Sequence, residues 1–483
     1  MNLYIIDLDS ISYKEGVLQL FNFRLATLLL SLSVLEGCAN SSIFNPYPAQ
    51  ASLFQQAIIA SDNHVSSKAL AVLADLEEKK ESADALLYMM ERGRINQLNG
   101  LFTESKKDFE FVIANFEAQD LESTVEFSEV GAKGASLITN DNIVPYKGAG
   151  YERVFTHHHQ AFNYLGLRDF EGASVEFRKA ALEQRILLEK YEQEVAEAYA
   201  DAEENGIDLN TLSSEFSGMD HIAGKVKSSF QNAYTFYASA AFWEATGDLN
   251  AAWVDYKKAF EINSNNTYLK QDIARVAKKL GERPEQKEMN EAQAGQGSVV
   301  VFFEDGFVPS KNEIKIPVPT FDGGLISLAF PYYETENWPV SLPLKAVDKD
   351  YSNLGTSELV VDVSALAVKD LQEHLPQRLV RQVLRGYSKY QIQKKAGDHA
   401  GVLGQFLATI YNIVSESADR RSWLTLPHST QIMRFNLGEG KKEVNISTAQ
   451  TQTKLVLEIQ SNKTIFVRVV NANNQLMTQI YTL

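Results

Sequence analysis

The sequence predicts an α+β protein of several domains, in which an array of helical hairpins precedes a mixed α+β domain. Between Pro48 and Pro284 only Pro145 interrupts the chain, and apolar residues recur every three to four positions, as in helices. Beyond about residue 298 the apolar residues are often β-branched or alternate with polar ones, as in strands. The polar segment 282–297 separates the two patterns and is the predicted linker.

The helical part, 51–281, contains a repeated pattern. In the segments 91–113, 157–182 and 236–260, a turn is followed by a small residue, then an aromatic one, then another small or short apolar one, at constant spacing. These positions are Ser105, Phe109 and Val112; Ala173, Phe177 and Ala180; and Ala252, Tyr256 and Ala259. The pattern resembles the second half of the tetratricopeptide (TPR) repeat, in which small residues let two helices approach closely.

The spacing of the turns agrees with that resemblance. Gly100 and Arg168 are 68 residues apart, which is twice a period of about 34 residues. The third turn lies 79 residues further on, so an insertion is expected at Val195 to Lys227, and 266–280 is expected to be a capping helix. A generic array of helical hairpins without TPR geometry is the alternative.

The second part, 298–483, is predicted to be a mixed α+β domain with a helical insert at about 365–418. The exposed edge of the last strand could accept a strand from a partner. The predicted strands are 299–303, 313–318, 325–330, 358–363, 454–460, 464–470 and 475–483.

Charge and cysteine content exclude several classes of function. A net charge of −16 argues against binding to nucleic acid, whose phosphates attract Lys and Arg, and against electrostatic binding to anionic lipid. A single cysteine excludes a disulfide framework and a cysteine-based zinc site. We therefore expect no nucleic-acid partner.

The N-terminal apolar segment is predicted to be a signal peptide, 1–37. Leu25 to Leu35 is 11 residues long, whereas a membrane-spanning helix needs about 20. The acidic residues before Arg24 indicate a true start further downstream. An ordinary signal peptide, or a buried helix with an incidental cysteine, is the alternative.

Leu35-Glu36-Gly37-Cys38 resembles a bacterial lipobox. The resemblance implies lipidation of Cys38, cleavage before it, and a lipidated tether at 38–50 that holds the protein to a membrane. Ala39 and Asn40 follow the cysteine, and the absence of Asp next to it favours the outer membrane by analogy with enteric sorting.

Two further blocks carry a wider resemblance. The first contains Asn140-Asp141, Pro145-Tyr146 and Tyr151-Glu152-Arg153, and the second contains Asp419, Arg421, Ser422, Trp423, Leu426 and Pro427. Together with the lipobox they resemble an uncharacterised family of Gram-negative TPR lipoproteins. That family is often encoded beside lipoproteins related to curli-secretion and penicillin-binding-protein-activator proteins, which implies work in the cell envelope.

Three groups of residues contain side chains that catalysis or metal binding could use. Consecutive helical residues point about 100° apart, so His157, His158 and His159 cannot converge on one ion, and we expect no metal. Glu152 and Glu176 could act as general acids, but a buried ion pair is the favoured interpretation. Asp419, His428 and Ser429 do not form a nucleophile–base pattern. We expect neither a catalytic residue nor a cofactor.

The sequence thus predicts a scaffold or adaptor that is lipid-anchored at the outer membrane on the periplasmic side. Its TPR groove is expected to bind a protein partner, and Asp419, Arg421 and Trp423 to cap a helix end and pin it to the α+β domain. A module that binds or cleaves cell-wall glycan, with its site in 140–178, is the alternative, and the oligomeric state stays open. The residues predicted to bind the partner are Tyr146, Tyr151, Glu152, Arg153, Tyr164 and Trp243.

Overall fold

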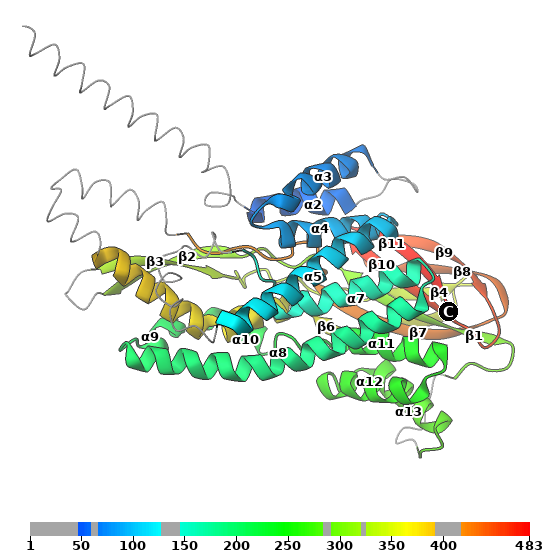
Figure 1. Cartoon of the computed structure of the whole chain (residues 1–483). Helices are drawn as coiled ribbons and strands as arrows, with labels where there is room; N and C mark the ends of the chain where they lie inside the picture. The colour runs from blue at the N-terminus through cyan, green and yellow to red at the C-terminus, as the bar shows by residue number, and fades with distance from the viewer. Residues whose placement is uncertain (1–46, 59–65, 127–144, 284–290, 320–324, 392–416) are drawn as a thin grey trace, which may run out of the picture. The chain divides into compact units, whose positions relative to one another are not determined.

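Three helical hairpins follow one another along the chain (Figure 1). The helices α4 (Ala85–Leu98), α7 (Gly150–Gly166) and α11 (Ala233–Thr246), here called the inner helices, each pack against the next helix in the chain. These partners, here called the outer helices, are α5 (Phe102–Glu126), α8 (Phe170–Glu204) and α12 (Leu249–Ile262).

Further helices extend the array at both ends and connect its hairpins. α2 (Ala51–Ile58) and α3 (Ser67–Glu78) pack against each other and against α4, and α13 (Thr267–Lys279) packs against α12. The shorter elements are η1 (Tyr47–Gln50), η2 (Lys79–Glu81), α9 (Leu209–Ser214), η3 (Ser217–Met219) and α10 (Asp220–Ala223). The predicted insertion at 195–227 therefore contains the end of α8 and these last three elements.

The computed structural model describes residues 47–58, 66–126, 145–283, 291–319, 325–391 and 417–483. Residues Tyr47–Leu483 form one compact unit. The predicted signal peptide, Cys38 and most of the tether lie outside the described residues. Within the described residues, no helix combines the length and the hydrophobicity that crossing a membrane requires.

The three hairpin turns have the same backbone geometry. Gly100, Arg168 and Gly247 each have a positive φ, of 77°, 59° and 96° respectively. This left-handed conformation ends one helix and allows the next to begin two residues later. The side chains of Asp169 and Asp248 then cap the N-termini of α8 and α12.

The strands form two larger sheets and one hairpin. The five-stranded sheet has the order β11-β10-β1-β7-β6, in which β1 pairs in parallel with β10 and antiparallel with β7. Its strands are β1 (Gln296–Asp305), β6 (Glu358–Asp362), β7 (Ser429–Gly438), β10 (Thr464–Ala472) and β11 (Gln475–Thr482).

The four-stranded sheet has the order β5-β4-β8-β9, and β2 pairs with β3. These strands are β2 (Asn312–Pro319), β3 (Leu325–Tyr332), β4 (Lys345–Asp348), β5 (Asn353–Thr356), β8 (Gly440–Ser447) and β9 (Gln452–Ile459). Two helices, α14 (Val363–Glu373) and the residues 375–391, follow β6.

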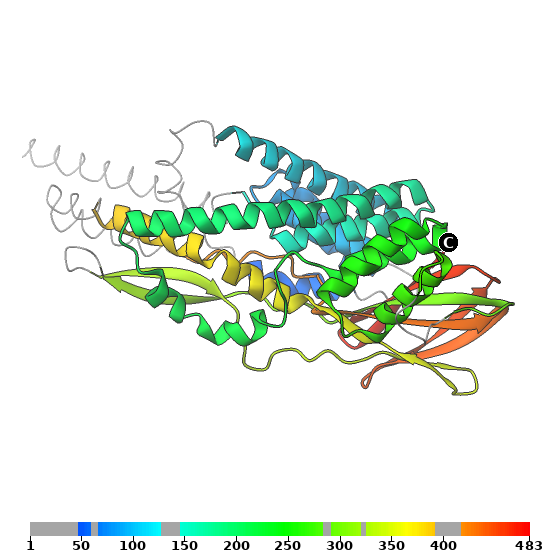
Figure 2. The ribbon, with the colours of Figure 1, turned by 90° about the horizontal axis from the view of Figure 1, so that it is seen from below.

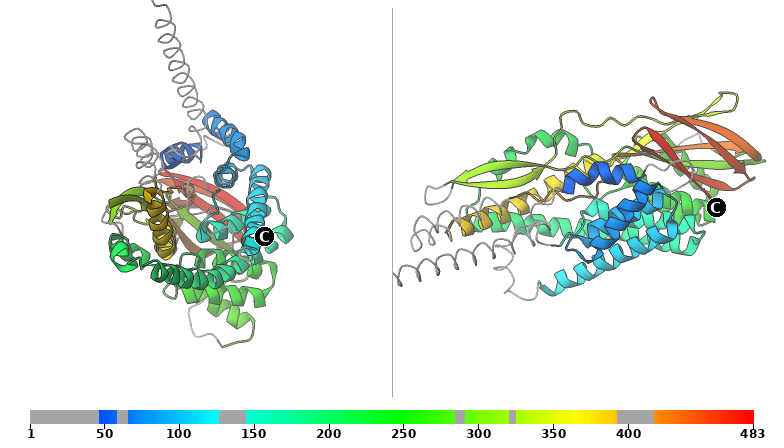
Figure 3. Two further views of the ribbon diagram at one scale, coloured as in Figure 1. Left: turned by 60° about the vertical axis from the view of Figure 1, so that its left-hand side comes forward. Right: turned by 90° about the horizontal axis from the view of Figure 1, so that it is seen from above.

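The five-stranded sheet lies between the helices and the four-stranded sheet (Figures 2 and 3). Val300 and Phe302 of β1 belong to the core that contains the inner helices. Val299, Val301 and Phe303 belong to a second core, shared with β8 and β9. Because β1 is buried on both faces, its sequence is a continuous apolar run rather than an alternating one.

The α+β class predicted from the sequence is confirmed by this mixed architecture. The described parts of the predicted linker, 282–283 and 291–297, follow α13 and extend into the start of β1. The helices before the linker share one core with the strands after it. Strands are present at all seven predicted positions, whereas β4, β5, β7 and β8 were not predicted. The helical insert is present as α14 and 375–391, and its remainder, up to residue 416, lies outside the described residues.

Candidate functional site

The described parts of the two sequence blocks meet in the interior of the protein, whereas Asn140 and Asp141 lie outside the described residues. The segment 417–428, here called the strap, leads into β7 and lies across α4 and α7. Two carboxylates hold it there. The backbone amide of Trp423 donates to Glu152 Oε1 of α7 at 2.7 Å, and that of Leu424 donates to Glu91 Oε1 of α4 at 2.6 Å.

Glu152 is fully buried and accepts hydrogen bonds on both oxygens. Tyr146 Oη donates to Oε2 at 2.6 Å, the amide of Ala149 donates to the same atom at 2.9 Å, and Tyr151 Oη donates to Oε1 at 3.2 Å. Burial raises the pKa of Glu152, although these donors oppose the shift. With four donors around it, this carboxyl has its acceptor positions taken by the chain itself.

Glu91 of α4 is the second carboxylate that binds the strap. Tyr47 Oη donates to its Oε1 at 2.9 Å and Thr425 Oγ1 donates to its Oε2 at 2.6 Å. Burial raises the pKa of Glu91 to about 7, although the hydrogen bonds from Thr425 and Leu424 act against the rise. Glu91 therefore joins the first described residue of the chain to the strap.

Arg421 fixes the other end of the strap. Its guanidinium pairs with Asp419 through two bonds of 2.9 Å, forms an ion pair with Asp84, and lies over the ring of Tyr146. Its carbonyl oxygen accepts a hydrogen bond of 2.9 Å from Lys311, a buried lysine whose pKa is lowered by that burial. Asp419, Arg421 and Trp423 thus join the strap to the N-terminal ends of two inner helices.

A second buried cluster joins the inner helices to the five-stranded sheet. Glu304 of β1 accepts a hydrogen bond from Arg468 Nε of β10 at 2.7 Å and pairs with Arg94 of α4. Burial would raise the pKa of Glu304, but the guanidiniums of Arg468 and Arg94 lower it to about 2. Arg468 also donates to Gln97 at 2.7 Å and to His159 Nδ1 at 3.0 Å.

His158, His159 and Glu304 form the one group among the described residues whose ligand atoms lie within 4.8 Å of one another, as a metal site would need. Their charge environment disfavours a divalent cation, because Arg94 and Arg468 already neutralise the carboxylate. Moreover, an arginine can only donate, so the Nδ1 of His159 is the acceptor and the proton of the neutral ring lies on Nε2. We assign no metal to this group.

A third cluster joins α11 and α13 to β7. Glu244, at the end of α11, pairs with Arg275 of α13 at 2.7 Å and with Arg434 of β7 at 3.0 Å. Burial would raise the pKa of Glu244, yet the two guanidiniums hold it well below its usual range. Each hairpin of the array is therefore attached to the strap or to the sheet through buried charge.

The other predicted partner-binding residues lie elsewhere. Arg153 is buried beside Asp120 and Glu183, and Trp243 is buried with its Nε1 donating to Asp255. Tyr164 is half-buried under Lys106. Hence the structure groups Tyr146, Tyr151 and Glu152 with the strap, and it does not bring Tyr164 or Trp243 to them.

Several members of these clusters were missed by the sequence analysis. Glu91, Glu304 and Arg468 are charges inside apolar surroundings, and such a charge is the signal that could have identified them. In the strand 464–472, Arg468 is the one charged residue, and Glu304 directly follows five apolar residues.

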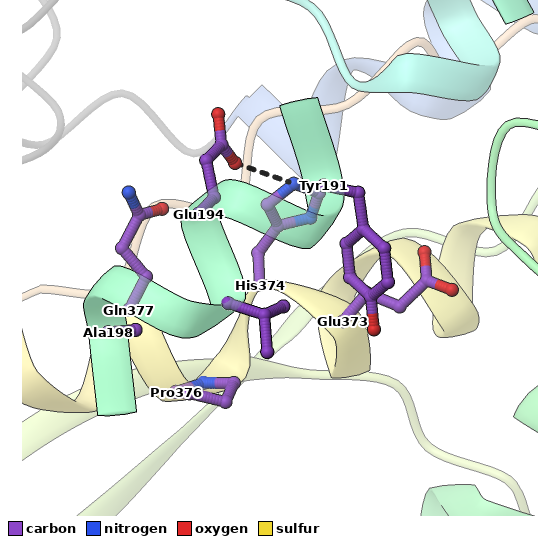
Figure 4. Close-up of a pocket in the computed structure, with 8 residues that line it drawn as sticks. Tyr191, Glu194, Ala198, Glu373, His374, Pro376 and Gln377 are labelled. Atoms are coloured by element: carbon purple, nitrogen blue, oxygen red, sulfur yellow. Dashed lines mark ion pairs between the residues drawn. The ribbon is translucent and has the colours of Figure 1, made fainter. Parts of the chain in front are cut away.

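One small hollow opens between α8 and the end of α14 (Figure 4). Its empty space, open solvent included, is about 200 Å³, and His374 Nε2 lies 3.7 Å from Glu194 Oε2 in its wall. Ligand pockets usually measure about 300–1,000 Å³, so this hollow is too small to bind a typical metabolite. Its lining residues are Tyr191, Glu194, Val195, Ala198, Glu373, His374, Pro376 and Gln377.

Comparison of the chain with protein-family models, with curated proteins and with solved structures finds no match.

Proposed function

We propose that this chain is a scaffold or adaptor of the cell envelope, held to the outer membrane on its periplasmic side through a lipidated Cys38. One observation carries the scaffold proposal. Of the two candidate general acids, Glu152 accepts a hydrogen bond from the chain's own backbone and has no exposed surface, and Glu176 is bound to His157 at 2.7 Å. Glu91 is likewise fully buried and accepts a hydrogen bond from the backbone. Such groups fix the architecture and are not free to transfer protons to a substrate.

The helical array is proposed to be TPR-like. In support, the repeated small and aromatic positions occupy equivalent places in the three hairpins and are buried. Ser105, Ala173 and Ala252 have no exposed surface, and the aromatic rings of Phe109, Phe177 and Tyr256 fill the space between helices. Close approach of helices through small residues is what a TPR array requires.

The partner surface is proposed to lie on the outer helices. α4, α7 and α11 are covered by the five-stranded sheet and the strap, so the side of the array that a TPR groove would offer is occupied by this chain. The outer helices instead expose apolar side chains, among them Leu121 at 69%, Val175 at 43% and Leu182 at 42%. Exposed apolar groups of this kind are typical of protein contacts when they gather on one face.

Site-specific photo-crosslinking in intact Gram-negative cells tests this proposal. A crosslinker at Val175 or Leu182 is expected to capture the same protein partner, whereas one at Val456, on the exposed face of β9, is expected to capture none. A Cys38→Ala variant should leave the membrane fraction and lose the partner. If positions on α8 and on β9 give the same pattern, or no partner at all, the adaptor proposal is wrong.

A further inference from the structure

The edge strand β11 has backbone groups that nothing in the described structure binds. The amide of Leu483 donates to Thr464 O, and partners alternate along an antiparallel ladder. The amides and carbonyls of Leu476, Thr478, Ile480 and Thr482 therefore point away from β10. Thr478 and Thr482 are exposed, and 46% of Ile480 is exposed, so this edge is open to solvent.

Other edges of the described sheets carry features that prevent further pairing. At the far edge of the same sheet, the side-chain amides of Asn263 and Asn266 donate to carbonyl oxygens of β6. β9 carries Lys454 and Glu458, and β5 is only four residues long. In the β2–β3 hairpin, β2 contains two prolines and β3 is mostly buried.

β11 has none of these features. Its sequence, QLMTQIYT, contains no charge, no proline and no glycine, and it includes β-branched and aromatic residues. The strand is also held rigidly from its helix side, because Tyr481 packs against Phe102 and Phe162 and Gln479 donates to the carbonyl of Gln97. A rigid, uncharged, exposed edge is preorganised to pair with another strand.

We propose that β11 pairs antiparallel with β11 of a second copy of this chain, about a two-fold axis at Gln479. The five-stranded sheets of the two copies then continue into each other. In this register Thr478 faces Ile480 of the other copy, and Leu476 faces Thr482, so each pair exchanges two backbone hydrogen bonds.

A second copy fits this edge because the edge is self-complementary. On the face that carries Thr478 and Ile480, both cross-strand pairs join a β-branched residue to an apolar or another β-branched one, which is a favourable combination in sheets. The chain carries a net charge of −16, yet the seam has no charged side chain, so like charges do not face each other there.

Sedimentation analysis of the full chain in mild detergent tests the proposal, with three variants. Wild type is expected to have the mass of two chains. Ile480→Lys places two charges at the seam, and Thr478→Pro removes an outward amide without affecting the ladder to β10, so each should weaken dimerisation about tenfold or more. Val456→Lys is the matched control. Val456 is also 46% exposed, and its amide also points outward from an edge strand, so this variant should stay dimeric.

Disulfide trapping tests the register directly. In a Cys38→Ala background, oxidation of mixed Thr478→Cys and Ile480→Cys chains should give the cross-linked heterodimer, since paired Cα atoms lie about 5.5 Å apart. Thermal melting of every variant shows whether it folds. A monomeric wild type, a dimer that survives both edge variants, or failure of the mixed chains to cross-link would overturn the proposal.

Discussion

Each carboxylate oxygen of Glu152 accepts a hydrogen bond from a backbone amide, which makes the carboxylate hard to replace. Its oxygens accept from the amides of Ala149 and Trp423 and from two tyrosine hydroxyls. A glutamine in its place would direct its NH₂ group at one of the two backbone amides and leave that amide unsatisfied in the interior.

We therefore expect Glu152→Gln to lower the free energy of unfolding by about 2 kcal/mol or more, measured by urea titration. The matched control is Glu189→Gln on the exposed surface of α8, which should leave the urea midpoint unchanged. A Glu152→Gln protein of unaltered stability would show that the strap does not depend on this carboxylate.

Glu91 should make stability depend on pH. Its pKa rises from 4.5 to about 7 on folding because it is buried. The folded state then binds a proton more tightly than the unfolded state, so this contribution is fully present below pH 4.5 and is lost as pH rises through about 7.

The expected loss is up to about 3 kcal/mol, following 1.36 kcal/mol per pKa unit, and Glu91→Gln should abolish it. The measurement is the difference in unfolding free energy between wild type and Glu91→Gln at a series of pH values. His158, whose pKa burial lowers to about 3, acts in the opposite sense in both proteins and cancels from this difference. If the difference in unfolding free energy does not change with pH, Glu91 does not titrate from a buried position.

At the scale of elements, the hairpin turns show how local sequence and geometry agree. All three turns need a left-handed residue, and two of them have glycine. The middle turn has Arg168 at φ 59°, a conformation that costs a residue with a Cβ about 1 kcal/mol.

Arg168→Gly is therefore expected to stabilise the protein by about 0.5–1 kcal/mol, whereas Gly247→Ala should destabilise it by a similar amount. Thermal denaturation of both variants measures the two effects. The two substitutions should therefore change the stability in opposite directions. If Arg168→Gly destabilises the protein, the arginine side chain contributes more stability than the strained backbone costs.

Local sequence patterns explain which elements could be predicted from the sequence. The outer helices and β1 follow simple patterns, helical spacing in one case and a buried apolar run in the other. β7 was not predicted, because seven of its ten residues are buried irrespective of polarity, including Thr430, Gln431 and Arg434. Its polar side chains are bonded to the helices and neighbouring strands, so neither alternation nor an apolar run marks it.

At the scale of the whole molecule, buried charge joins the helices to the sheets. Glu304 pairs with both Arg94 and Arg468, which come from α4 and β10. Removing the carboxylate would leave two guanidiniums buried without compensation, a change that typically costs about 3–5 kcal/mol.

Glu304→Gln should accordingly lower the stability of helices and strands together. Far-ultraviolet circular dichroism, which reports the helices, and amide hydrogen exchange in β1 and β10, which reports the sheet, should give coincident transitions at a lower midpoint. Glu443→Gln, which alters an exposed pair with Lys454, is the control and should not shift the midpoint. Separate transitions would show that the helical array and the sheets fold independently.

The sequence alone determined the α+β class, the helical hairpins with their turns, and most strands, because these depend on local periodicity and on turn residues. It also identified the two motif blocks, but not what they do. Only the tertiary structure brought Glu152 to the strap, paired Glu304 with two arginines, and laid the chain's own sheet against the inner helices. These are contacts between segments up to 382 residues apart, as between Gln479 and Gln97, and no local pattern encodes them. A buried charge depends on the partner that neutralises it, and that partner is set only when the whole chain packs.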